Sequence, residues 1–373
     1  MQTHKLNILY IEPFYSGSHK QWIDAYQNHS NYNIQILSLP GKKWKWRMHG
    51  GAITLSEEYN KSKNHYDIIL CSDMLNLPVF KALCFDNLSN SKVVMYFHEN
   101  QITYPWSPYD EDVKLSRDLH YAYINYTSSL VSDFNFFNSN YHLNSYMKGL
   151  KKYLKKMPDF NNLETIETIK KKSSVLYLGC DLKKNKYKNK DNDLPVVLWN
   201  HRWEYDKNPE LFFKTLYKIK EKNIDFKLVV LGENFTNSPS IFKEAKHKLK
   251  DEILHFGFCE SFEEYLNWIN MSDILPITSN QDFFGVSIVE GIYAKTLPIL
   301  PHRLSYPELI DIKNNKRVFY DSEKEFLDLL VYHLIHYKDL RKYTTRYKDI
   351  IFRFDWSNIK NEYDDKFEKI LFN

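Results

Sequence analysis

The hydrophilic stretch DLKKNKYKNKDND, residues 181–193, divides the sequence into two parts with the same pattern. It has few apolar side chains to bury, so it predicts a linker, which we place at residues 181–194. On both sides of it, short apolar runs alternate with amphipathic stretches. Because such alternation is typical of parallel sheets flanked by helices, the sequence predicts an α/β protein with two doubly wound, Rossmann-like domains facing a cleft.

The apolar runs define the predicted domains. Residues 1–180 form the N-terminal domain and residues 195–338 the C-terminal domain, while residues 339–373 have helical spacing without a strand and are expected to pack across both domains. The predicted strands are residues 7–11, 34–39, 67–71, 93–97, 134–137 and 175–178, followed by 195–199, 226–231, 253–256, 274–277, 297–300 and 318–320.

Composition restricts the class of protein. With 373 residues, 43% hydrophobic and 26% charged, the chain is long enough for two packed cores and is not of the disordered type. Its four cysteines lie far apart without a C-x-x-C pair, which argues against a zinc site or a disulfide framework. No signal-peptide pattern and no long apolar run is present, so we expect a cytoplasmic protein without stable membrane association.

In open parallel sheets, ligands bind beyond the carboxyl ends of the strands, so the residues after each predicted strand are candidates for a site. After the first strand come Ser16, Gly17, Ser18 and His19, where backbone N–H groups at a helix start are able to hold an anion or a sugar hydroxyl. A serine-capped helix after a glycine turn explains the same residues. No G-x-G-x-x-G motif follows, which disfavours a dehydrogenase.

The fourth predicted strand ends in a polar cluster that contains His98, Glu99 and Asn100. A histidine near a core is often only hydrogen-bonded, but its polar neighbours favour a role in binding or proton transfer.

The first strand of the C-terminal domain is followed by Arg202 and Lys207, just before a helix that Pro209 is expected to open. Two cations beside a helix N-terminus would stabilise a diphosphate. Surface ion pairs with Glu204 and Asp206 are the alternative, and this motif alone leaves the choice open.

The stretch DFFGVSIVEG, residues 282–291, also follows a strand and runs into a helix. Asp282 is expected in the loop and Glu290 about two turns into the helix, where a buried carboxylate needs a partner. Phe284 and Gly285 form the turn between them. A capped helix with a surface glutamate is the alternative.

Two basic stretches lie in the N-terminal domain. In the first, cations alternate with aromatic rings, a combination able to hold a single-stranded nucleic acid, although an exposed basic turn explains it equally well. The second, residues 148–156, is on a predicted helix and suits RNA phosphates or an anionic membrane, although lysine-rich helix faces are usually only solvated. The residues of the first stretch are Lys42, Lys43, Trp44, Lys45, Trp46 and Arg47.

A carboxylate site for a metal ion would normally show as a D-x-D motif at a strand end. Residues 110–112 and 191–193 have this pattern but lie in predicted polar loops, so we expect no metal ion and no other cofactor.

The spacing Arg-x4-Lys, followed by a carboxylate-x7-Glu with Phe-Gly inside, resembles the donor site of retaining GT-B glycosyltransferases. This resemblance implies that Arg202 and Lys207 bind the leaving diphosphate, that Glu290 binds the ribose, and that Asp282 with Phe284 and Gly285 contacts the transferred sugar. The first acid of that pattern is usually Glu. In this chain the first acid is Asp282, whose side chain is one methylene shorter.

A longer resemblance extends through nearly the whole chain, to the tRNA-queuosine alpha-mannosyltransferase family. It implies transfer of mannose from GDP-mannose to the cyclopentene diol of queuosine in a tRNA anticodon, with Gly17 and Gly257 at the donor, His98 near the sugar, and Ser18, His19, Glu99, Asn100 and residues 42–47 at the acceptor. The motifs that carry it are IEPFYSGSHKQW, LPGKKWKWR, YFHENQITYP, HRWEYDKNPELFFK, VLGENFTNSPSIFKEAK and DFFGVSIVEG.

Two other functions remain open at this point. A GT-B enzyme acting on a lipid or glycan would use the basic helix at residues 148–156 at a membrane. A non-catalytic module that binds a nucleotide sugar or tRNA would keep the fold, but the full set of polar residues at the strand ends argues against it.

Overall fold

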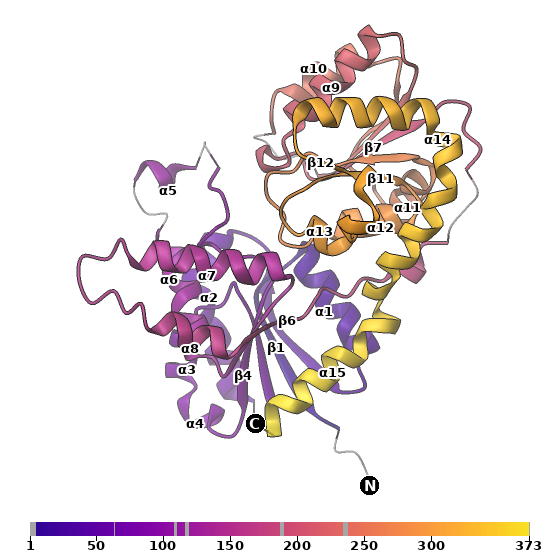
Figure 1. Cartoon of the computed structure of the whole chain (residues 1–373). Helices are drawn as coiled ribbons and strands as arrows, with labels where there is room; N and C mark the ends of the chain where they lie inside the picture. The colour runs from indigo at the N-terminus through magenta and orange to yellow at the C-terminus, as the bar shows by residue number, and fades with distance from the viewer. Residues whose placement is uncertain are drawn as a thin grey trace. The chain divides into compact units, whose positions relative to one another are not determined.

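A computed structural model describes residues 5–62, 64–107, 110–115, 119–186, 190–233 and 238–372. It divides into two compact units: unit 1 comprises residues 1–180 and 356–373, and unit 2 comprises residues 181–355. Each unit is a six-stranded parallel sheet with helices on its faces (Figure 1).

Unit 1 has the strand order β2-β1-β3-β4-β5-β6. Its strands are β1 (Asn7–Tyr15), β2 (Asn33–Pro40), β3 (Ile68–Ser72), β4 (Lys92–Phe97), β5 (Phe134–Phe137) and β6 (Ser173–Val175). Its helices are α1 (Gly17–His29), α2 (Trp44–Lys61), α3 (Leu77–Leu83), α4 (Phe85–Leu88), α5 (Glu111–Lys114), α6 (Leu119–Val131), α7 (Asn140–Leu154), α8 (Thr165–Lys171) and α15 (Trp356–Phe372).

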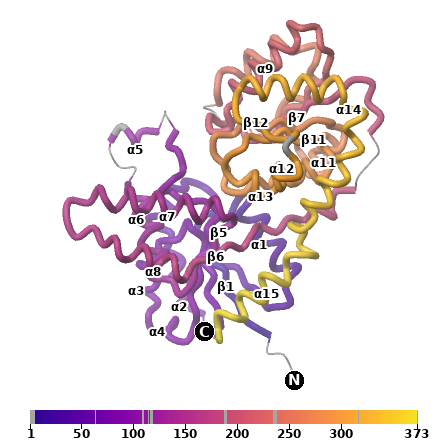
Figure 2. Tube along the Cα trace, in the orientation of Figure 1, coloured from indigo at the N-terminus to yellow at the C-terminus, as the bar shows by residue number. Residues whose placement is uncertain are grey.

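Alternate residues of the unit 1 strands face two different helix layers. Side chains such as Ile69 and Met95 pack with α2, α3, α6, α7 and α8 in one core. On the other face, Trp22 of α1 stacks on Tyr96 and donates from its indole nitrogen to the Tyr363 hydroxyl of α15 at 3.0 Å. The C-terminal helix therefore lies beside α1 and completes the sheet's second layer (Figure 2).

Unit 2 has the strand order β12-β11-β10-β7-β8-β9. Its strands are β7 (Val196–Asn200), β8 (Lys227–Leu231), β9 (Ile253–Gly257), β10 (Ile274–Pro276), β11 (Leu297–Pro301) and β12 (Phe319–Tyr320). Its helices are α9 (Pro209–Glu221), α10 (Ile241–Lys248), α11 (Phe262–Met271), α12 (Val286–Tyr293), α13 (Tyr306–Leu309) and α14 (Glu323–Ile351).

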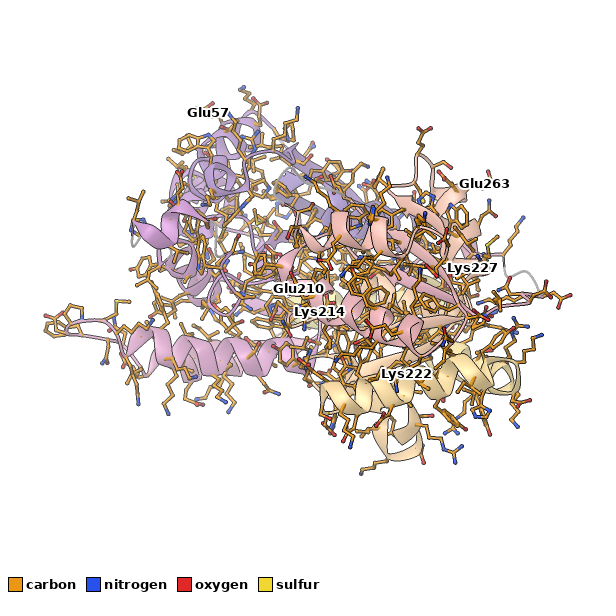
Figure 3. The ribbon with its side chains drawn as sticks, turned by 90° about the horizontal axis from the view of Figure 1, so that it is seen from above. Glu57, Glu210, Lys214, Lys222, Lys227 and Glu263 are labelled. Atoms are coloured by element: carbon orange, nitrogen blue, oxygen red, sulfur yellow. The ribbon has the colours of Figure 1, made fainter. Side chains whose placement is uncertain are left out.

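Helix α9 shows how the unit 2 core is built. Pro209 occupies its first turn, and the Asn208 side chain caps it by accepting from the Leu211 N–H at 3.3 Å. Its apolar face, including Phe212, packs against Trp199 of β7, whereas Glu210 and Lys214 lie one turn apart on the exposed face (Figure 3).

The α/β prediction is confirmed, and each predicted strand overlaps a strand of the structure. Two boundaries are wrong by more than a residue or two. The strand expected at residues 7–11 extends to Tyr15 as β1, and the strand expected at residues 175–178 is β6, Ser173–Val175. The following carbonyls are taken by side chains instead of a neighbouring strand. Tyr96 donates its hydroxyl to the Leu176 carbonyl at 2.8 Å, and Tyr363 donates to the Tyr177 carbonyl at 2.6 Å.

Candidate active site

A buried carboxylate of β1 lies against a histidine of α1. Glu12 is completely buried and accepts hydrogen bonds from Tyr10, Ser72 and the Phe14 N–H. Its Oε2 lies 2.8 Å from Nδ1 of His19 in the first turn of α1. Burial by itself would raise the pKa of Glu12, but the charge of His19 and these hydrogen bonds lower it below its usual value.

The histidine of this pair is cationic. Burial alone would lower the pKa of His19, but the charge and hydrogen bond of Glu12, with smaller contributions from Asp73 and Glu99, raise it to about 9. Ser16, the N-cap of α1, makes no capping bond through its side chain, so the alternative of a serine-capped helix is not what the structure shows. Gly17 has a φ of 51°, and the space next to its Cα is open within 4 Å.

His98 follows β4 and stacks on His19, with ring centroids 4.2 Å apart. Its side chain is buried, yet neither ring nitrogen has a hydrogen-bond partner among the described residues. Burial, together with the charges of His19 and His142, lowers the pKa of His98 well below its usual value, so the ring is neutral. A buried neutral imidazole with unused nitrogens is poised to bind an uncharged polar group such as a hydroxyl.

Two further polar side chains at the ends of β3 and β4 also keep buried atoms without partners. Asp73 accepts from the His98 N–H at 2.8 Å through Oδ1, while its Oδ2 and the Asn100 amide nitrogen have no partner in the described part of the chain. Burial raises the pKa of Asp73. Glu99 is half-buried and accepts from the Gln101 amide at 3.0 Å. The structure thus places the candidates His19, His98, Glu99 and Asn100 in one part of unit 1, and their role stays a prediction. The sequence analysis did not single out Asp73.

In unit 2, Lys207 is buried after β7. Its Nζ lies 3.1 Å from Asp206, 3.6 Å from Asp282 and 2.8 Å from the Gln281 carbonyl, to which it donates. Burial would lower the pKa of Lys207, but Asp282 and Asp206 outweigh it and raise the pKa. The contact between Lys207 and Asp282 therefore connects the two predicted donor motifs, Arg-x4-Lys and residues 282–291.

Arg202 differs from Lys207 in exposure. Its side chain is 49% exposed and pairs with Glu204 at 3.1 Å. Both ion pairs considered as the alternative, Arg202 with Glu204 and Lys207 with Asp206, are therefore present, but only the first is a surface pair.

Asp282 and Glu290 each receive a tyrosine hydroxyl. Tyr306 donates to Asp282 at 3.0 Å, and Tyr265 donates to Glu290 at 2.6 Å. Asn200, at the end of β7, in turn donates to the Tyr265 hydroxyl at 2.9 Å. Burial raises the pKa of Glu290 to about 7, although the Tyr265 hydrogen bond opposes the shift. The sequence analysis missed the partners Tyr265, Tyr306 and Asn200 because they come from distant segments.

The turn between these acids departs from one expectation. Helix α12 begins at Val286, so Glu290 is its fifth residue and lies about one turn inside it, not two. Gly285 precedes the helix with a φ of 94°, a conformation that favours glycine, and no side chain caps α12. Phe284 is buried, with its carbonyl accepting from Ser305 at 3.0 Å. Gly257, at the end of β9, has a φ of 151° with open space beside it.

The predicted RNA-binding residues 42–47 lie at the start of α2. Lys42 and Lys43 are exposed, and Trp46 is 63% exposed. Trp44 instead packs against Tyr121, and Lys45 pairs with Asp110 and Asp112 at 2.5 Å each. Arg47 donates to the Pro40 carbonyl at 3.2 Å. The segment is thus partly folded into unit 1.

Among the described residues, His255, Cys259 and Glu264 have metal-ligand chemistry within 4.8 Å of one another. Their atoms have other contacts: His255 Nε2 lies 3.2 Å from the Gly257 carbonyl, and Glu264 accepts from the Glu260 N–H at 3.0 Å. The absence of a required metal stays a prediction.

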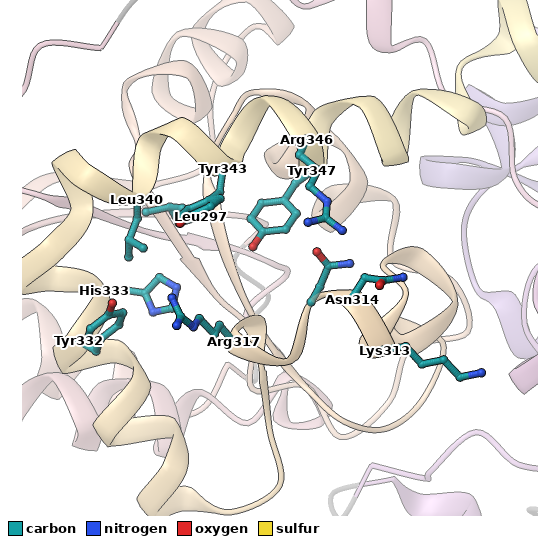
Figure 4. Close-up of a pocket in the computed structure, with 11 residues that line it drawn as sticks. Leu297, Lys313, Asn314, Arg317, Tyr332, His333, Leu340, Tyr343, Arg346 and Tyr347 are labelled. Atoms are coloured by element: carbon teal, nitrogen blue, oxygen red, sulfur yellow. The ribbon is translucent and has the colours of Figure 1, made fainter.

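A cavity of about 330 Å³ lies elsewhere in unit 2, between α14 and the segment before β12 (Figure 4). Leu297, the first residue of β11, lines it, so the cavity is at the amino ends of the parallel strands. Arg202 and Asp282 follow the carboxyl ends of β7 and β10, at the opposite edge. This cavity is therefore separate from the candidate donor residues.

Two parallel six-stranded Rossmann-like sheets, with C-terminal helices, are the architecture of the GT-B fold. The fold is similar to that of a glycosyltransferase from Rickettsia africae, with a TM-score of 0.69, 18% identity and coverage of 99% of this chain and 100% of that one. It is also similar to sucrose-phosphate synthase from Thermosynechococcus elongatus, with a TM-score of 0.74, 12% identity and coverage of 98% and 99%.

Sequence comparison defines the family. Residues 7–180 match the tRNA-queuosine alpha-mannosyltransferase N-terminal family, and residues 182–349 match glycosyl transferases group 1. A tRNA-queuosine alpha-mannosyltransferase from Drosophila melanogaster is 34% identical over 325 residues, which cover 84% of each chain. The chain therefore belongs to the tRNA-queuosine alpha-mannosyltransferase family. Within the described residues, no helix combines the length and apolar character needed to cross a bilayer.

Proposed function

We propose that this enzyme transfers mannose from GDP-mannose to a hydroxyl of the cyclopentene diol of queuosine in a tRNA anticodon, with retention of configuration at the sugar. The observation that carries the proposal is the Drosophila relative, which is 34% identical over 84% of both chains. A tRNA substrate would place the enzyme in the cytoplasm. A lipid or glycan acceptor and a non-catalytic module are disfavoured by the same relative.

The unit 2 residues support the donor half of the proposal. Arg202 and Lys207 would bind the diphosphate, and the uncapped N-terminus of α12 would add N–H groups to it. Glu290, held by Tyr265, would accept from the ribose hydroxyls, and Asp282 would accept from the sugar. Gly257 leaves backbone groups accessible to the nucleobase.

The transfer breaks one bond at the anomeric carbon of the sugar and forms another. The bond from that carbon to the phosphate oxygen breaks, and the diol oxygen bonds to the same carbon. The departing phosphate oxygen takes the diol proton. The protein stabilises the charge that develops on the diphosphate, while His98, with its unused buried nitrogens, orients the sugar or the incoming hydroxyl.

The direct test incubates the purified enzyme and queuosine-containing tRNA with a panel of nucleotide sugars. Nucleosides from the digested tRNA are then analysed by mass spectrometry. We expect queuosine to gain one hexose with GDP-mannose alone, and chelator is expected to leave the rate unchanged. Transfer from another nucleotide sugar would overturn the donor assignment, and an unchanged queuosine mass with every donor would overturn the function.

A further inference from the structure

Unit 1 contains a cavity of about 500 Å³, which is lined partly by the basic stretch 148–156 and by none of the residues assigned above to the donor or the acceptor. It lies between the segment that follows the polar end of β4 and the face of α7. Its lining residues are Gln101, Ile102, Thr103, Tyr104, Trp106, Leu119, Ala122, Ser145, Lys148, Gly149, Lys152, Tyr153 and Lys156.

Three lysines form a row along one wall of this cavity. Lys148 and Lys152 are four residues apart on one side of α7, about 6 Å from each other along the axis, and Lys156 lies in the turn that follows the helix and lines the same cavity. All three side chains are exposed, and none forms an ion pair with another residue that the structure describes. Among the described residues that line the cavity, none carries a carboxylate.

Aromatic rings form part of the remaining wall. The half-buried Trp106 is held by Tyr121, with ring centroids 5.8 Å apart, and Tyr153 is fixed by its hydroxyl, which donates to the Leu119 carbonyl at 3.1 Å. Gly149 lets the helix approach Thr103, since a Cβ there would lie 2.3 Å from Thr103 Cγ2. These contacts fix the two rings and bring the backbone of α7 close to Thr103.

The segment that lines the cavity is also hydrogen-bonded to a residue of the candidate active site. Asn100 Oδ1 accepts from the Ile102 N–H at 3.1 Å and from the Thr103 N–H at 2.9 Å, and Gln101 follows directly. The segment that lines the cavity is therefore positioned by the same polar cluster that contains His98.

We propose that this cavity binds single-stranded RNA, with Lys148, Lys152 and Lys156 on backbone phosphates and the aromatic wall against an unpaired base. A row of cations beside aromatic rings is the combination that single strands require, because phosphates need neutralisation and bases need a stacking surface. A volume of about 500 Å³ is in the range of small-molecule sites and accommodates one base. Only the identity of the bound RNA, a tRNA anticodon, rests on the proposed function.

An anionic membrane is the other polyanion that a lysine row would attract. Binding by a surface helix also needs apolar side chains that insert between the lipids. Helix α7 contributes none of the large exposed hydrophobic side chains found in the described residues. The basic side of α7 also borders a concave surface, which fits a base better than it fits a flat bilayer.

The test compares two double variants of the full chain with the same change in charge. K148E/K152E reverses two cavity lysines, while K151E/K155E reverses two lysines of the same helical stretch that do not line the cavity. Dissociation constants for an anticodon stem-loop RNA are measured at several salt concentrations, with thermal unfolding as the check on folding. Both double variants change the net charge equally, so the long-range repulsion of the RNA is the same in both. A difference between their dissociation constants therefore reports the contribution of the cavity lysines.

We expect K148E/K152E to bind the RNA at least tenfold more weakly than K151E/K155E at low salt. The slope of log Kd against log salt should also be smaller by about two for K148E/K152E than for wild type. W106A should weaken binding and W106F should restore it. Equal losses in the two double variants would overturn the proposal. If K148E/K152E does not fold, K148Q/K152Q carries the same comparison with an expected difference of about threefold.

Flotation with phosphatidylserine vesicles separates the membrane from RNA. The proposal is overturned if K148E/K152E loses binding to the vesicles but keeps its binding to RNA. Failure of the proposed function is distinguishable: wild-type protein that binds RNA through these lysines but leaves queuosine unmodified refutes the function and not the cavity. Normal mannosylation by K148E/K152E, with unchanged KM for tRNA, refutes the cavity and not the function.

Discussion

The candidate residues of the two units differ in how completely their polar atoms are paired. In unit 2, Lys207 contacts two carboxylates and a carbonyl, and Asp282 and Glu290 each receive a tyrosine hydroxyl. In unit 1, His98, Asp73 and Asn100 all keep buried atoms without a partner in the described residues. The ion pairs of unit 2 hold charged groups in place for a charged ligand, while His201 and Gln281 beside them also keep a buried nitrogen without a partner in the described residues. Unpaired buried groups need a polar ligand to complete them, and in unit 1 these groups include the candidate residues His98 and Asn100 themselves. We infer that unit 2 holds the nucleotide and unit 1 holds the uncharged reacting groups.

The largest expected effect is on Arg202→Ala. The loss of one cation that stabilises the leaving diphosphate should lower turnover by about 10²–10³-fold. Stability should change by no more than about 0.5 kcal/mol, because the side chain is 49% exposed and surface pairs contribute little. Steady-state kinetics and thermal unfolding measure the two effects. Glu204→Gln removes the same pair but keeps the cation, so it should retain turnover; near-normal turnover of R202A would remove Arg202 from the donor site.

The second effect concerns the buried pair in unit 1. Glu12→Gln should lower the free energy of unfolding by about 3 kcal/mol near pH 6, because the His19 cation loses its buried partner. The pKa of His19 is raised to about 9, so its contribution is complete below about pH 6.5 and is lost as the pH rises toward 9. The lowered pKa of Glu12 makes its contribution complete above about pH 4.5 and lost at lower pH.

Urea unfolding of wild type and E12Q at pH 6 and pH 9.5 measures this dependence. The difference between the two proteins should shrink at the higher pH. Asp24→Asn, which removes a surface partner of Lys20 on the same helix, should change stability by less than about 0.5 kcal/mol at both values. A pH-independent difference for E12Q would show that the pair is not ionised.

A smaller effect is expected for Glu290→Gln. The loss of a charge-assisted hydrogen bond to the ribose should weaken GDP binding by about tenfold at pH 8. The pKa of Glu290 is raised to about 7, so in the free protein its ionisation costs stability as the pH rises between about 4.5 and 7, and GDP affinity should fall as the pH drops below 7. Calorimetric titration from pH 6 to pH 8.5 should show this dependence in wild type and lose it in E290Q. A dependence that persists in E290Q belongs to another group.

The smallest effect is expected for Lys45→Ala. Because Asp110 and Asp112 already neutralise this lysine, its removal should change tRNA affinity by less than about twofold. The tRNA dissociation constants of K45A and K148E/K152E, measured under the same conditions, show which basic stretch contributes more to RNA binding. If K45A binds tRNA fivefold more weakly or worse, residues 42–47 contact the RNA after all.

Strand positions could be predicted from the sequence because parallel strands buried on both faces consist of short apolar runs, as Ile68–Ser72 does. The same pattern misplaced β6, because the residues after Val175 are buried by Tyr96 and by Tyr363, which is distant in sequence. Position after a strand was enough to single out His98 and Lys207 as candidates. It did not identify Tyr265 or the partners of Lys45, since a pairing between distant segments has no local signal.

The dissociation constant of GDP alone tests the division between the two units most directly, when it is measured on wild type, Arg202→Ala and His98→Gln. GDP carries no sugar, so it reports the nucleotide site without the reacting groups. We expect R202A to bind GDP at least tenfold more weakly, and H98Q to bind it within about twofold of wild type while losing more than 100-fold in turnover. Equal loss of GDP affinity in the two variants would contradict the assignment of the nucleotide to unit 2 and of the reacting groups to unit 1.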